Sequence, residues 1–133
     1  MTAYRYPDAI VETDWLEAHL NDANLLVFDC TVHLLYDEAA PGKPYRVKSG
    51  REDYDKGHIP GSGFLDLQGE LSKTDSPYSF TLPSADHFAA AIAKHGVGSD
   101  TRVVLYSTAN AQWATRIWWM LRAFGFANAA LLN

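Results

Sequence analysis

Two side chains with nucleophilic atoms, Cys30 and Ser107, stand where apolar runs end. The runs, residues 25–28 and 102–106, are typical of buried parallel strands. A cysteine reacts as its thiolate, which a cationic neighbour favours, and a serine hydroxyl needs an adjacent base. The sequence places neither kind of neighbour beside them. We therefore interpret Cys30 as a small residue at a strand end and Ser107 as part of a strand-to-helix turn.

Two histidines could also carry chemistry. His33 lies three residues after Cys30, but a single Cys–His pair falls short of the four ligands of a structural zinc site, and no second cluster exists. We therefore predict no metal and no cofactor. His58 could act as an acid or base, but its place in a Gly-rich turn favours a hydrogen bond to the backbone.

The elements that must position these residues alternate between strands and helices along the chain. That alternation indicates an α/β fold with a parallel sheet. Thr13 and Ser84 are expected to cap helices, and Gly57, Gly96 and Gly125 are expected to end them in left-handed conformation. The expected helices are 13–20, 50–56, 85–93 and 112–124, the strands 25–28, 64–67, 102–106 and 129–132, and the loops 36–49 and 68–83.

Composition limits the functional class. The 133 residues suit one domain, and 47% hydrophobic residues suffice for a core. A net charge of −5 argues against nucleic acid or an anionic membrane as partner. A single cysteine cannot form an internal disulfide, and neither a signal segment nor a membrane span is visible, so we expect a cytoplasmic protein.

The apolar run 129–132 ends the sequence at Asn133. Domain termini usually extend into solvent rather than stop on a buried strand. We therefore expect residues 1–133 to form a single domain that is the N-terminal part of a longer, two-domain protein.

Three segments together resemble the rhodanese (thiosulfate sulfurtransferase) superfamily. They are residues 27–29, residues 50–62 with Arg51 and Gly57-His58-Ile59-Pro60-Gly61, and the strand-loop-helix 103–121. The resemblance implies a three-layer α/β fold, with a central, mainly parallel sheet of about five strands and helices on both faces. It also implies sulfur transfer through a cysteine persulfide, formed in a tight loop whose amides and helix N-terminus favour the thiolate.

The loop of this chain departs from the pattern of active family members. Ser107 occupies the place of the cysteine, and a hydroxyl cannot carry a sulfane sulfur. Gln112 stands where many single-domain members have arginine, and Trp113 stands where related phosphatases have one. Because the whole loop differs, we interpret it as a natural loss rather than a single Cys-to-Ser change, with no catalytic residue. The degenerate loop comprises Ser107, Thr108, Ala109, Asn110, Ala111 and Gln112.

The resemblance is to the N-terminal half of tandem-domain sulfurtransferases in particular. It implies a second, catalytic rhodanese domain following in the same chain as the partner. Arg116, Trp119 and Arg122 are candidates for the interdomain contact, with Trp119 able to stack on both arginines, while Trp118 is explained by core packing. The loop from Tyr36 to Lys48 is another candidate contact.

Three further residues are expected near the site in structural roles: Asp29, Arg51 and His58. The resemblance implies an Asp29–Arg51 ion pair beneath the loop. An alternative function stays open, in which the chain is a free-standing rhodanese-like module that senses a small anion or docks a protein. A phosphatase-like enzyme is the third hypothesis, and it lacks the cysteine and arginine it would need.

Overall fold

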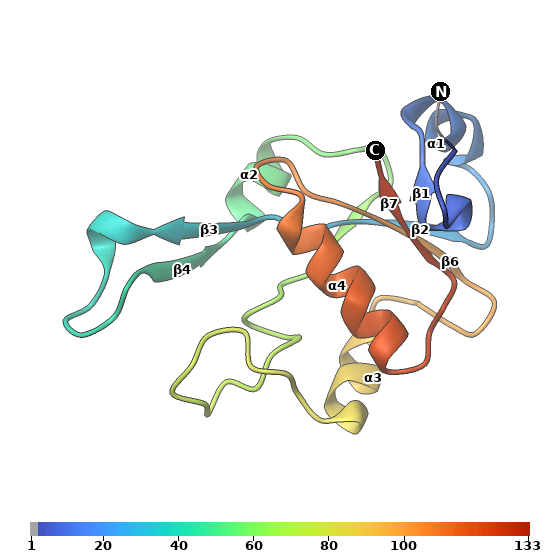
Figure 1. Ribbon diagram of the computed structural model, residues 1–133. Helices are drawn as coiled ribbons and strands as arrows, with labels where there is room; N and C mark the ends of the chain where they lie inside the picture. The colour runs from blue at the N-terminus through green and yellow to red at the C-terminus, as the bar shows by residue number, and fades with distance from the viewer. Residues whose placement is uncertain (1–2) are drawn as a thin grey trace.

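The computed structural model describes residues 3–133, which form a five-stranded sheet with helices on both faces (Figure 1). All pairings within this sheet are parallel. The order is β1 (Ile10–Val11), β7 (Ala129–Leu132), β6 (Arg102–Tyr106), β2 (Leu25–Asp29) and β5 (Gly63–Phe64). The predicted fold class is therefore confirmed, with β6 and β2 at the centre.

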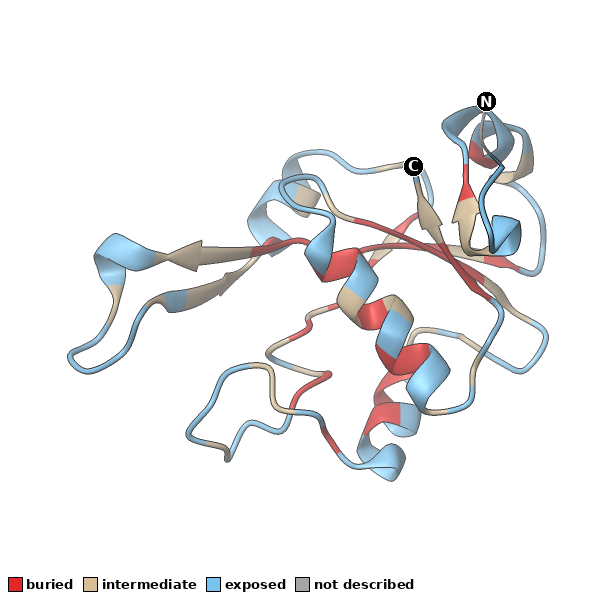
Figure 2. Ribbon diagram, viewed as in Figure 1, coloured by how far each residue is buried: buried red, intermediate tan, exposed pale blue. Residues whose placement is uncertain are grey.

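The alternation of side chains along β6 explains the three layers. Val103 and Leu105 pack into the larger core cluster with α3 (Ala85–Lys94) and α4 (Gln112–Ala123). Val104 points to the opposite face and packs with α1 (Thr13–His19). Successive residues of a strand face opposite sides of a sheet, so a continuous apolar run is what two covered faces require. Figure 2 shows the resulting buried band through the sheet and along one side of α4.

An antiparallel hairpin projects from this body (Figure 1). It consists of β3 (Val32–Leu35) and β4 (Arg46–Ser49), and a 3-10 turn, Tyr36–Glu38, follows β3. The prediction of a loop over 36–49 is therefore wrong for β4. Its residues are mostly polar and half-buried, and lack the apolar pattern by which a strand is detected. Cross-strand pairing with β3 holds them instead.

Helix starts agree with the sequence in part. The Ser84 side chain accepts a hydrogen bond from the His87 amide, so the predicted cap of α3 is confirmed. Thr13 is the first residue of α1 rather than its cap, and the cap position belongs to Glu12, whose side chain makes no capping bond.

Helix ends agree in part as well. Gly96 and Gly125 have φ of 86° and 94°, in the left-handed region that glycine adopts freely. Gly57, which ends the short helix α2 (Arg51–Lys56), has φ of 178°, so its backbone is extended and the predicted left-handed stop is wrong. Among residues 3–133, no helix is both long and apolar enough to cross a bilayer.

Candidate functional site

The Ser107 loop connects the carboxyl end of β6 to the start of α4, the place the sequence predicted. The Ser107 hydroxyl donates to the carbonyl of Asn110 at 2.5 Å, and the Asn110 side-chain oxygen accepts from the Gln112 amide at 2.9 Å. These two bonds join residues of the loop to one another. Asn110 thus bonds the amide of the first helical residue, but the cap position belongs to Ala111, which makes no side-chain capping bond. The segment is the strand-to-helix turn that the sequence favoured.

A buried polar network holds this loop from below. The Thr31 hydroxyl donates to Asp29 Oδ1 at 2.5 Å and accepts from the Thr108 amide at 3.0 Å. The Thr31 amide also donates to Asp29 Oδ1, at 2.9 Å. Asp29 and Thr31 are 1% and 0% exposed, so the bonds between them are shielded from water, while the bond from the exposed Thr108 is only partly buried. The network joins the end of β2 to the loop after β6.

These contacts bear on whether the loop can hold an anion. An anion-binding loop needs backbone amides that are free to donate. The Thr108 amide is used by Thr31, and the Gln112 amide is used by Asn110. Ala109 and Ala111 are exposed and bring no charge to the loop. Two amides of the loop are therefore unavailable to an anion, and residues 107–112 bring no cationic side chain to hold one.

Cys30 is the one thiol of the chain, and it lies in the core with 0% of its surface exposed. Burial is the main cause that raises the pKa of this thiol well above its ordinary value, and the neighbouring Asp29 raises the pKa further. A buried, protonated thiol is a poor nucleophile. The interpretation of Cys30 as a structural residue at a strand end is confirmed, with burial more complete than expected.

His58 lies in the turn after α2. Its Nδ1 lies 2.7 Å from the Tyr54 carbonyl oxygen, and its ring stacks on the Tyr54 ring at 3.9 Å between centroids. The Tyr106 hydroxyl anchors the same turn through the Ile59 amide and the Ser62 hydroxyl, at 3.3 and 3.2 Å. His58 is thus the backbone-bonded turn histidine that the sequence favoured. These bonds attach the turn to Tyr106, the last residue of β6 and the one before Ser107.

The expected Asp29–Arg51 ion pair does not form. Arg51 Nε donates to Asp55 at 3.0 Å, and its guanidinium lies 5.2 Å from the Tyr54 ring centroid. Both partners are on α2 and reachable over one helical turn, while the Asp29 carboxylate is already bonded to Thr31 in the core. Arg51 pairs with Asp55 and Tyr54 at the surface because its guanidinium would lose its hydration if it entered the core to reach Asp29.

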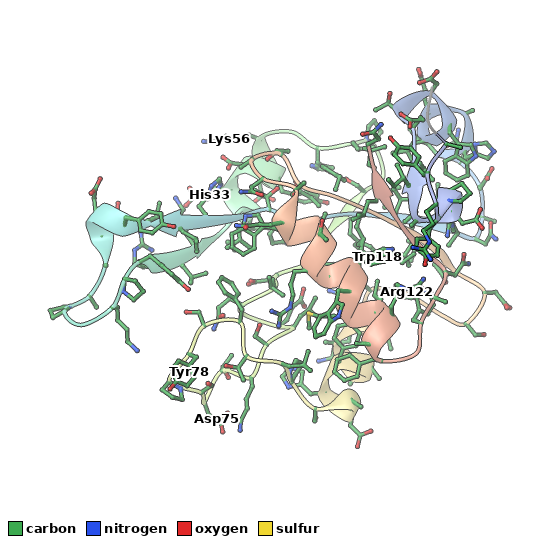
Figure 3. The ribbon with its side chains drawn as sticks, in the orientation of Figure 1. His33, Lys56, Asp75, Tyr78, Trp118 and Arg122 are labelled. Carbon is green, nitrogen blue, oxygen red and sulfur yellow. The ribbon has the colours of Figure 1, made fainter. Side chains whose placement is uncertain are left out.

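The predicted arginine–tryptophan patch on α4 divides into two separate contacts. Arg116 lies over Trp119, 5.5 Å from the ring centroid, and donates to the Phe80 carbonyl at 2.7 Å. Arg122 lies over Trp118 instead, at 5.0 Å, and Figure 3 shows these two residues together on one side of α4. The expectation that Trp119 stacks on both arginines is therefore wrong for Arg122.

Two residues that hold the site were not found from the sequence. Thr31 directly follows Cys30, just before the β-hairpin, and no pattern in the sequence around it marks it as a buried residue. Phe80 has a positive φ of 60° and is fixed by Gln68, which accepts from its amide at 2.7 Å, and by Arg116. Within residues 3–133, no cluster of three His, Cys, Asp or Glu side chains could hold a metal ion.

The site can now be compared with known proteins. The chain is 34% identical to a thiosulfate sulfurtransferase of Cricetulus griseus over 131 residues, covering 94% of the chain and 40% of that relative. It is 35% identical to the 3-mercaptopyruvate sulfurtransferase of Escherichia coli K12 over 123 residues, covering 92% and 41%. The chain thus spans about two fifths of the length of these relatives.

The fold comparison agrees with the sequence comparison. The crystal structure of SseA from Escherichia coli, a 3-mercaptopyruvate sulfotransferase with a rhodanese fold, superposes with a TM-score of 0.75. The sequence identity is 34%, and the match covers 94% of this chain and 44% of that one. The Rhodanese-like domain model matches residues 12–133, nearly the whole length, and the chain therefore belongs to the rhodanese-like domain family.

Proposed function

We propose that this chain is the non-catalytic half of a thiosulfate- or 3-mercaptopyruvate-type sulfurtransferase. The observation that carries the proposal is Ser107 at the carboxyl end of β6, where the family resemblance expects the persulfide-forming cysteine. Its hydroxyl is committed to the Asn110 carbonyl, and a hydroxyl oxygen cannot accept and release a sulfane sulfur.

Cys30 does not replace the missing nucleophile. Sulfur transfer needs a thiolate that donor and acceptor can both reach, and Cys30 has no exposed surface. Its pKa is raised by burial, which lowers the thiolate fraction further at neutral pH. The residues of this chain therefore support the sulfurtransferase by structure rather than by chemistry.

The partner that this function requires is a second, catalytic rhodanese domain, following in the same polypeptide. The length of the relatives supports it, because the chain spans only about two fifths of each. We keep Arg116, Trp119 and Arg122 as candidates for contact with that domain, now as two patches on α4. We also infer a cytoplasmic location, because the chain has no cysteine pair for a disulfide.

The direct test is an assay of the purified chain with thiosulfate and cyanide. We expect thiocyanate formation at the background rate and no mass increase of one sulfur atom on the protein after incubation with thiosulfate. The matched control is Cys30→Ala, which should behave like the native chain. Rapid turnover that Cys30→Ala abolishes would overturn the proposal and make Cys30 the nucleophile.

The full reading frame distinguishes the alternative, a free-standing rhodanese-like module. A downstream rhodanese domain with a cysteine loop supports the non-catalytic half. A stop codon or an unrelated domain would favour the module. For such a module we favour docking over anion sensing by the loop, because residues 107–112 carry no cationic side chain and two of their amides, those of Thr108 and Gln112, are already bonded.

A further inference from the structure

A hollow of about 660 Å³ lies between the N-terminal segment and the last turns of α4. Its volume is in the range of sites that hold small molecules. The degenerate loop 107–112 does not line it, so it is separate from the site described above. The side chains that give it chemical character are Arg5, Tyr6, Asp8, Trp118 and Arg122.

The two arginines of this hollow make no ion pair with any carboxylate of residues 3–133. Each guanidinium lies over an aromatic ring instead, Arg5 over Tyr6 at 5.5 Å and Arg122 over Trp118 at 5.0 Å. Stacking on a ring leaves the N–H groups at the guanidinium edge available. Those groups match the paired oxygens of a carboxylate or a phosphate.

Asp8 adds one negative charge to the same hollow. Two guanidinium groups against one carboxylate leave an excess of one positive charge, which favours an anionic ligand over a neutral or cationic one. Asp8 also offers an acceptor for an N–H or O–H group on the ligand. The aromatic walls favour a ligand with a planar ring beside its anionic group.

Two parts of the hollow, the Trp118 ring and the backbone at Asp8, are held by hydrogen bonds. The Trp118 indole N–H donates to the Ala129 carbonyl at 3.1 Å. Arg102 donates to the Asp8 carbonyl at 2.7 Å and to the Asn128 side chain at 3.1 Å, which holds the N-terminal segment against the end of the sheet. Groups that are already ordered lose less entropy on binding, so the arrangement favours affinity.

We propose that this hollow binds a small organic anion, whose carboxylate or phosphate is held by Arg5 and Arg122 and whose planar ring lies against Trp118 or Tyr6. The carrying observation is the convergence of two unpaired guanidinium groups and two aromatic rings on one cavity. The proposal does not depend on the missing nucleophile, because no residue of the loop takes part. It shares one residue with the proposed interdomain contact, Arg122.

The test follows the indole N–H resonance of Trp118 in the full chain by NMR, with the resonance assigned from Trp118→Phe. Adenosine 5′-monophosphate probes a phosphate on a planar ring, and indole-3-acetate probes a carboxylate on one. We expect at least one of them to shift the resonance saturably. Adenosine has no anionic group and inorganic phosphate has no ring, so each should bind at least about tenfold more weakly than the better probe.

Variants tie the binding to the hollow. Arg122→Gln and Arg5→Gln should each weaken the binding about tenfold, since each removes charge-assisted hydrogen bonds. Arg46→Gln is the matched control, because Arg46 lies on β4 outside the hollow and should leave the Kd unchanged. Arg5 is exposed in the terminal segment, so Arg5→Gln should fold even if Arg122→Gln does not.

The response to each probe decides the identity of the anion. Binding of the nucleotide alone indicates a phosphate ligand, and binding of indole-3-acetate alone indicates a carboxylate. Failure of both probes to shift the Trp118 resonance at millimolar concentration overturns the proposal. So does binding that Arg5→Gln and Arg122→Gln leave unchanged. Neither result bears on thiocyanate formation, so the two proposals fail independently.

Discussion

Thr31 and Thr108 lie 77 positions apart in the sequence, yet the Thr31 hydroxyl accepts the Thr108 amide at 3.0 Å. The same hydroxyl donates to Asp29, so one side chain joins the ends of β2 and β6. The Thr31 backbone also contacts Gly50 so closely that a Cβ there would lie 2.6 Å from the Thr31 carbonyl oxygen. Thr31 is therefore the point at which the three family segments meet.

Thr31→Val should destabilise the chain by about 2–4 kcal/mol. The change keeps the side-chain shape but removes the hydroxyl bonds of a buried carboxylate oxygen and a backbone amide. Chemical denaturation followed by circular dichroism measures the loss. Thr115→Val is the matched control, because its hydroxyl bonds the Ala111 carbonyl in an exposed position and its loss should cost under about 0.5 kcal/mol. Equal losses for the two variants would contradict the role of the network.

Ser107→Cys should not create a working sulfurtransferase. The new thiol would sit in a loop whose Thr108 and Gln112 amides are already bonded and which has no arginine. The thiolate and its persulfide would therefore have fewer amide donors and no cationic side chain of the loop to stabilise their negative charge. We expect thiocyanate formation from thiosulfate and cyanide within about twofold of background.

The outcome separates two explanations of the loop. Ellman's reagent should label one thiol per chain, because the loop is at the surface and Cys30 is buried. Labelling of the new thiol shows that it is accessible, and protection of Cys30 shows that the variant is folded. Fast sulfur transfer by Ser107→Cys would mean that one atom alone was missing. The interpretation that the whole loop, and not Ser107 alone, has lost the groups needed for sulfur transfer would then be wrong.

Much of this fold could be predicted from the sequence because its strands and helices carry strong patterns. The runs 25–28, 102–106 and 129–132 are covered on both faces, so their continuous apolar character is visible in the sequence. The capping of α3 by Ser84 is a local contact over three residues, and local contacts can be predicted without knowledge of the fold.

The contacts that hold the site could not be predicted in the same way. The Thr31–Thr108 bond depends on the carboxyl ends of the neighbouring strands β2 and β6 lying side by side, and the presence of two threonines in the sequence gives no indication of that. Arg51 was assigned to Asp29 by family resemblance, while Asp55, four residues along α2, offered a solvated partner at lower cost. Strand β4 was not predicted because it pairs with β3 alone and is half-buried, so its sequence does not show the apolar run of a buried strand.

Cys30 should resist modification in the folded chain. The side chain has no exposed surface, and burial raises the pKa of its thiol, so both access and thiolate fraction are low. Ellman's reagent at pH 8 should label the native chain only as fast as it unfolds, and label the chain in urea within minutes. Rapid labelling without denaturant would contradict the burial.

The raised pKa of Cys30 also predicts a dependence of stability on pH. The folded chain retains the thiol proton at a pH where the unfolded chain has lost it. The stabilising contribution is therefore complete below the ordinary thiol pKa of 9.0 and is lost as the pH rises above it. Under reducing conditions, the free energy of unfolding should fall more steeply above pH 9 in the native chain than in Cys30→Ala. Parallel curves would assign the slope to other groups, such as Tyr106, whose pKa burial also raises.

Phe80 should tolerate glycine better than alanine, the reverse of the usual order. Its φ of 60° lies in the left-handed region, where a Cβ costs about 1–2 kcal/mol and glycine avoids the cost. Both substitutions lose the contact of the Phe80 ring with Trp113, at 5.3 Å between centroids, so their difference reports the backbone. We expect Phe80→Gly to be about 1 kcal/mol more stable than Phe80→Ala in denaturation experiments. At the exposed Trp119 of α4, alanine should instead exceed glycine by about 1 kcal/mol. The same order at both positions would show that the bonds from Gln68 and Arg116 do not hold Phe80 in a strained conformation.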